Sequence, residues 1–77
     1  MLKKRVEEIL NEQLNREFYS AYLYLSMSAY FDSTDLPGFA HHMKVQYQQE
    51  MAHAIRIFNY LSNVGGRVEL KAIAQPK

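Results

Sequence analysis

The chain has 77 residues, 48% of them hydrophobic, and can form one small domain. It has no Cys, which excludes disulfides, so we expect a metal ion or self-association to stabilise its small core. The formal net charge of +1 comes from interspersed acidic and basic residues, which excludes the electrostatic patterns typical of nucleic-acid and membrane-surface binding. The N-terminus lacks the apolar run of a secretory signal, and no apolar stretch approaches the roughly 20 residues needed to cross a bilayer, so we expect a soluble, cytoplasmic protein.

The first predicted element is a long helix from about residue 2 to residue 32. This segment contains no Gly and no Pro, and its apolar residues recur at helical spacing. One face follows alternating steps of four and three residues, which is typical of a helix packed at a shallow angle on a neighbour. That face consists of Leu10, Leu14, Glu17, Ala21, Tyr24, Ser28 and Phe31. Between Phe18 and Phe31 apolar residues also occupy the other sides, which predicts contacts with more than one further helix.

The second predicted element is a helix from about 37 to 64, after a turn at residues 33–36. Pro37 suits a first helical turn because its missing N–H needs no partner there. The packed face is predicted to consist of Phe39, Met43, Gln46, Glu50, His53, Ile57, Tyr60 and Val64. Gly65 and Gly66 predict the end of this helix, and residues 65–77 are expected to be an extended tail. The prediction is an all-α fold, a single antiparallel two-helix hairpin over residues 1–77.

Three ionisable residues interrupt the two packed faces: Glu17, Glu50 and His53. Glu50 and His53 are three residues apart and leave the same side of their helix. In an antiparallel hairpin Glu17 lies about 22 Å from the turn and the other two lie about 20 to 24 Å from it, so all three stand at one height. Burying these groups uncompensated would cost on the order of several kcal/mol per charge, and a bound cation removes that cost. The pattern indicates a site for iron, manganese or zinc, the alternative being a Glu–His pair that occurs by chance on a helix surface.

Five segments carry a resemblance to a known family. They are 15–17 (Asn-Arg-Glu), 22–27 (Tyr-Leu-Tyr-Leu-Ser-Met), 37–41 (Pro-Gly-Phe-Ala-His), 49–54 (Gln-Glu-Met-Ala-His-Ala) and 65–70 (Gly-Gly-Arg-Val-Glu-Leu). In this order and at these spacings they resemble the first two helices of the non-haem ferritins of bacteria and archaea. The resemblance extends over essentially all 77 residues and corresponds to the N-terminal half of a ferritin subunit.

The resemblance implies a role for each candidate residue. Glu17 would be a terminal ligand of a di-iron ferroxidase centre, Glu50 a bridging carboxylate and His53 the imidazole on the same iron as Glu17. Tyr24 would form hydrogen bonds beside the centre, the alternative being a packed core tyrosine. Many relatives have a glutamate, contributing to a third iron site, where this chain has Gln49. The ligands that complete the second iron lie in the family's third and fourth helices.

A two-fold pair of hairpins would bring together four carboxylates and two imidazoles, the ligand set of ferritin-like di-iron bundles. We therefore expect self-association, with iron and O2 as the other partners and zinc or manganese as substitute metals. The function that the resemblance implies is iron binding and ferroxidase activity, with two irons per four-helix bundle, linked to iron storage. Two alternatives stay open: a truncated or designed ferritin fragment that assembles as a scaffold with an inactive site, and one chain of a split ferritin.

Overall fold

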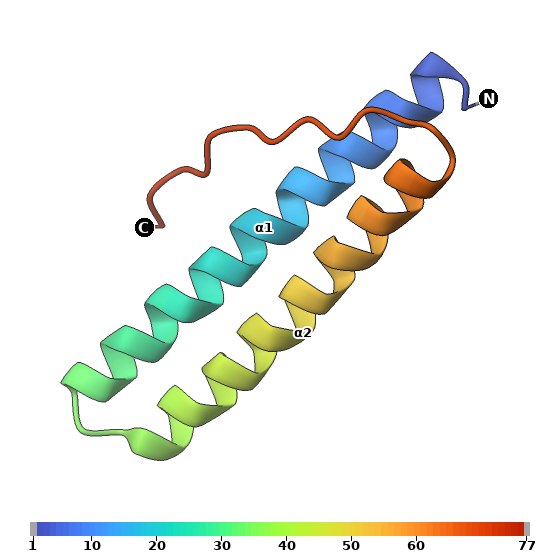
Figure 1. Cartoon of the computed structure of the whole chain (residues 1–77). Coiled ribbons are helices and arrows are strands. Elements are labelled where there is room, and N and C mark those ends of the chain that lie inside the picture. The colour runs from blue at the N-terminus through green and yellow to red at the C-terminus, as the bar shows by residue number, and fades with distance from the viewer. Residues whose placement is uncertain (1, 77) are drawn as a thin grey trace.

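Two long helices lie side by side in the computed structural model, which describes residues 2–76 (Figure 1). Helix α1 (Lys4–Ser33) and helix α2 (Pro37–Asn63) are antiparallel and form a flat body of 50 × 20 × 12 Å. The described residues contain no strand, so the predicted all-α hairpin is confirmed. Met1 and Lys77, the two ends of the expected domain, lie outside the described residues. Neither helix is long and apolar enough to span a membrane.

Both helices end with the same backbone arrangement. After α1, Asp35 adopts a left-handed conformation with φ 60°, and the Leu36 N–H donates to the Phe31 carbonyl at 2.9 Å. After α2, Gly65 has φ 77° and the Gly66 N–H donates to the Leu61 carbonyl at 2.8 Å. A residue in the left-handed region lets the chain turn back and satisfy a carbonyl of the last helical turn. Glycine adopts this conformation without strain at position 65, whereas Asp35 does so with a Cβ.

The interface between α1 and α2 is built around small and branched apolar residues. Leu14 and Ala21 of α1 are buried, and so are Ala40, Ala54 and Leu61 of α2. Ser28 is also buried, and its hydroxyl donates to the Ala40 carbonyl at 2.8 Å, which joins the helices near the turn. These alanines leave room for the two backbones to approach closely.

At three positions the predicted packed face of α2 is wrong, because the next residue along the chain is the buried one. The prediction placed Phe39, His53 and Tyr60 at the interface with α1. In the structure all three are exposed, Phe39 at 59% and Tyr60 at 50%, whereas their neighbours Ala40, Ala54 and Leu61 are buried. Apolar residues occur at both sets of positions, so periodicity alone does not decide which set faces α1. His53 consequently lies at the edge of the interface rather than inside it.

A hairpin only 12 Å thick leaves many large apolar side chains uncovered. Among the described residues, those at least 37% exposed are Val6, Ile9, Tyr22, Met27, Tyr30, Leu36, Phe39, Ile55, Tyr60, Leu70 and Ile73. The apolar surface extends over both helices, which is the condition expected of a surface that other helices cover.

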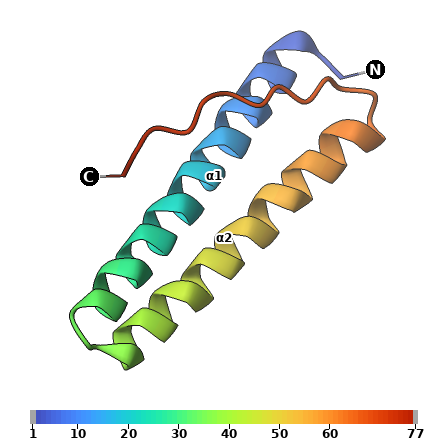
Figure 2. The same cartoon turned by 60° about the vertical axis from the view of Figure 1, so that its left-hand side comes forward.

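The tail folds back onto the hairpin. After α2 the chain is extended and runs beside the N-terminal half of α1 in both views (Figures 1 and 2). Val68 packs against the core cluster formed by Leu14, Ala54 and Leu61. The sequence predicts an extended tail, but its path along α1 depends on contacts between residues more than 50 positions apart.

Candidate metal centre

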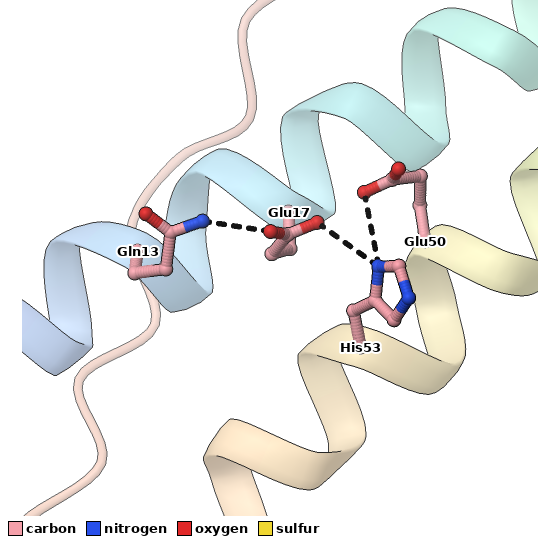
Figure 3. Close-up of polar contacts among 4 residues, drawn as sticks. All are labelled: Gln13, Glu17, Glu50 and His53. Atoms are coloured by element: carbon pink, nitrogen blue, oxygen red, sulfur yellow. Dashed lines mark hydrogen bonds and ion pairs between the residues drawn. The ribbon is translucent and has the colours of Figure 1, made fainter.

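The middle of the hairpin brings together the three residues that the sequence singles out as metal ligands. Glu17 comes from α1, and Glu50 and His53 come from one side of α2, three residues apart (Figure 3). Each residue offers one ligand atom, and these atoms lie within 4.8 Å of one another. Equal distances from the turn account for this convergence, because helices of equal rise keep such residues at one height.

The imidazole lies between the two carboxylates. His53 Nδ1 is 3.8 Å from Glu17 Oε2 and 3.8 Å from Glu50 Oε2. The Glu17 and Glu50 side chains are 17% and 20% exposed, whereas that of His53 is 50% exposed. The cluster therefore lies at one open edge of the helix interface, accessible to an ion and to a second protein surface.

The two carboxylates influence each other's protonation. A hydrogen bond with Glu17 raises the pKa of Glu50, and burial raises the pKa of Glu50 further. The same hydrogen bond with Glu50 lowers the pKa of Glu17, although burial acts in the opposite direction. Two carboxylates this close disfavour a second negative charge, and a bound cation would offset their repulsion.

Gln13 holds the carboxylate of Glu17 from one turn earlier on α1. Its Nε2 donates to Glu17 Oε1 at 2.7 Å, which leaves Glu17 Oε2 directed toward His53 (Figure 3). Gln13 was not among the residues predicted for the site. The available signal was its position four residues before Glu17, because side chains at this spacing are neighbours on a helix.

Tyr24 and Gln49 complete the candidates from the sequence. Tyr24 is partly buried on α1, two turns beyond Glu17, and it is not among the residues whose ligand atoms converge. Gln49 is exposed on α2, next to Glu50. Neither position changes the three-residue ligand set.

Almost the whole hairpin matches a known family of protein domains. The model of the ferritin-like domain matches residues 7–77. The chain belongs to the ferritin family. It is 38% identical over 77 residues to a bacterial non-heme ferritin of Staphylococcus aureus strain USA300, and 41% identical over 73 residues to that of Bacteroides fragilis strain 638R. All of the chain is covered in the first comparison and 95% of it in the second. The predicted resemblance to the non-haem ferritins is thereby confirmed.

Solved ferritin structures share the arrangement of the two helices and the tail. An engineered closed form of the Archaeoglobus fulgidus ferritin superposes with a TM-score of 0.96 at 49% identity, over 100% of this chain and 47% of that one. The open-pore ferritin of the same organism gives 0.95 at 50% identity, over 99% of this chain and 46% of that one. The chain also spans only 46% of the length of the two curated ferritins. The part of a ferritin subunit that it matches is therefore about half.

Proposed function

We propose that the chain binds Fe(II) at Glu17, Glu50 and His53, and that pairs of hairpins oxidise it with O2. The observation that carries the proposal is the convergence of these three ligand atoms within 4.8 Å, in a chain of the ferritin family. Ferritin-type iron storage is the wider role to which this activity would contribute.

The donor set suits iron. Carboxylate oxygens favour harder cations, and an imidazole nitrogen adds a ligand that iron accepts well. Close approach to Glu17 raises the pKa of Glu50, which is the effect expected where two negative charges repel each other and a cation would be favoured. A metal ion bound to both carboxylates would offset the cost of holding two negative charges close together in a partly buried site.

Three ligands from one chain leave the centre incomplete, and a second copy can supply the rest. If two hairpins pair around a two-fold axis, each contributes Glu17, Glu50 and His53, and the bundle holds four carboxylates and two imidazoles. This pairing would cover apolar side chains such as Phe39 and Tyr60, which are exposed in the hairpin. We infer two irons per bundle.

The side chains would bind and orient the iron and would not act as nucleophiles. Fe(II) is the substrate, each ion loses one electron, and O2 is the electron acceptor. Glu17 and Glu50 would balance the added positive charge of the oxidised ion, and Gln13 would keep the Glu17 carboxylate in its orientation. Tyr24 is proposed to lie beside the completed centre, as the family resemblance implies.

Anaerobic titration with Fe(II), followed by admission of O2, tests the proposal. The expected result is binding that approaches two irons per pair of chains, and then the absorbance of Fe(III). In Glu50→Ala and His53→Ala, tight binding and oxidation should both be lost while helicity is retained. Binding that stops well below this ratio, or that is unchanged in both variants, would contradict the proposal.

The second candidate function is a self-assembling helical scaffold without iron chemistry. The same exposed apolar surface supports this function, because a partner would cover it whether or not the three ligand residues bind metal. The partner would then be another copy or a separate polypeptide with the remaining helices. Thermal unfolding separates the two functions. A ligand that binds only the folded state raises the unfolding midpoint, because at 100 times its Kd it adds about 2.7 kcal/mol to the free energy of unfolding. An unchanged midpoint with Fe(II), together with a concentration-dependent one, favours the scaffold.

A further inference from the structure

A line of three polar side chains on α1 holds the tail through its backbone. The residues are Glu7, Asn11 and Asn15, spaced four apart, and we refer to them as the docking strip. They contact residues 67–71, the first part of the tail.

The contacts repeat along the strip. The N–H groups of Arg67, Glu69 and Lys71 donate to the side-chain oxygens of Glu7, Asn11 and Asn15 in turn, the last two at 2.8 Å and 2.9 Å. In the opposite direction, Asn11 Nδ2 donates to the Arg67 carbonyl and Asn15 Nδ2 to the Glu69 carbonyl, both at 2.9 Å. Each asparagine therefore pairs with the tail as a neighbouring strand would.

The spacing of the strip matches the repeat of an extended chain. Four residues of an α-helix rise about 6.0 Å. Two residues of an extended strand advance about 6.6 to 6.8 Å, and alternate residues point their N–H and C=O groups to the same side. The mismatch of under roughly 1 Å per repeat keeps three successive positions in register.

Each asparagine side chain also makes a hydrogen bond that does not involve the tail. The second hydrogen on each Nδ2 is donated to α1 itself, from Asn11 to the Glu7 carbonyl at 3.1 Å and from Asn15 to the Asn11 carbonyl at 2.8 Å. These bonds hold both carboxamides in one orientation, so binding the tail costs little side-chain entropy.

The strip and the metal ligand Glu17 lie on different sides of α1. At 100° per residue, Asn15 is about 160° and Asn11 about 120° away from Glu17 around the helix. A tail held by the strip leaves the edge that carries Glu17 free for a second hairpin.

We propose that the docking strip is a binding surface for extended polypeptide backbone, that its occupant is residues 67–71 of the same chain, and that it keeps the tail away from the metal-binding edge. Because the strip contacts only N–H and C=O groups, it does not require particular side chains at Glu69 or Leu70, both of which are exposed. The competing explanation is that the burial of Val68 against the core cluster holds the tail by itself.

Amide hydrogen exchange of the 77-residue chain, followed by NMR, tests the proposal. Asn15→Ala should accelerate exchange of the Lys71 N–H by about tenfold, because its acceptor is lost. Alanine is the better helix former, so α1 should stay intact. Val68→Ala should affect the Lys71 N–H much less than Asn15→Ala does.

Position 69 provides a matched pair. Glu69→Ala keeps the N–H that Asn11 accepts and should leave the protection of Lys71 unchanged. Glu69→Pro removes that N–H and should release the tail. The proposal is overturned if Glu69→Ala releases the tail as Glu69→Pro does, or if Val68→Ala matches Asn15→Ala. Protection of Lys71 that depends on chain concentration would also overturn it, since the occupant would then be the tail of a second copy.

Discussion

The two flanks of α1 differ in how completely the chain satisfies its own polar groups. On one flank Asn11 and Asn15 use their side-chain oxygens and both amide hydrogens within the hairpin and its tail. On the other flank Glu17 has Gln13 as a hydrogen-bond donor, and its remaining neighbours are a second carboxylate and an imidazole 3.8 Å away. The first arrangement stabilises the fold. The second leaves negative charge and open surface available for a cation and a second hairpin.

Glu50→Gln should have the largest effect of these substitutions, and the effect should be confined to metal binding. The amide keeps the size of the side chain and a donor toward Glu17, but it is a much poorer ligand for iron. We expect anaerobic Fe(II) affinity to fall by about 100-fold or more, above the range for loss of an outer-sphere partner. The unfolding midpoint of the metal-free chain should change little.

Glu12→Gln is the control for Glu50→Gln, because it makes the same chemical change at an exposed position of α1. It should leave Fe(II) affinity unaltered. Equal losses in the two variants would mean that overall charge, and not the Glu50 position, governs binding.

Asn11→Ala should act on the other flank and lower the stability of the hairpin. Asn11 is buried, and its loss removes two hydrogen bonds to the tail and leaves the Glu69 N–H without its acceptor. The expected cost is about 1–3 kcal/mol in urea unfolding. The exposed Asn59 on α2 offers the matched control, and Asn59→Ala should change stability by under about 0.5 kcal/mol. If the two variants unfold at the same urea concentration, the tail contributes nothing to stability.

Gln13→Leu should produce a smaller change, confined to metal binding. The substitution keeps the helix and most of the side-chain volume but removes the donor to Glu17 Oε1. We expect Fe(II) affinity to fall by about tenfold, the lower end of the range for outer-sphere partners. Gln48→Leu, at an exposed position of α2, is the control. An affinity equal to that of the unaltered chain would show that Glu17 orients itself without Gln13.

Asp35→Gly should have the smallest effect on stability and should change neither metal binding nor the docking of the tail. Asp35 has φ 60°, a conformation that is strained for a residue with a Cβ and unstrained for glycine. We expect the substitution to raise the free energy of unfolding by about 0.5–1 kcal/mol. Fe(II) affinity and protection of the Lys71 N–H should both stay the same. A change in either would show that the properties of the two flanks follow overall stability.

The candidate centre was predictable to a large extent because it depends on helical geometry. Glu17 and the pair Glu50 and His53 lie equally far from the turn, and two straight antiparallel helices bring such residues together without further information. Gln13 was not predicted, since its hydrogen bond to Glu17 depends on which rotamers the two side chains adopt.

By itself the sequence determined the two helices, the turn between them, the height at which the ionisable residues meet and the membership of the ferritin family. Local propensity, the breaks at Pro37 and Gly65, and repeat spacing suffice for these features. Only the tertiary structure decided that Ala54 and Leu61 face α1 while His53 lies at the edge. The tail's path was likewise decided by contacts such as that of Asn11 with Glu69. The physical reason is the same in both cases: close packing and long-range hydrogen bonds select among alternatives that periodicity leaves equal.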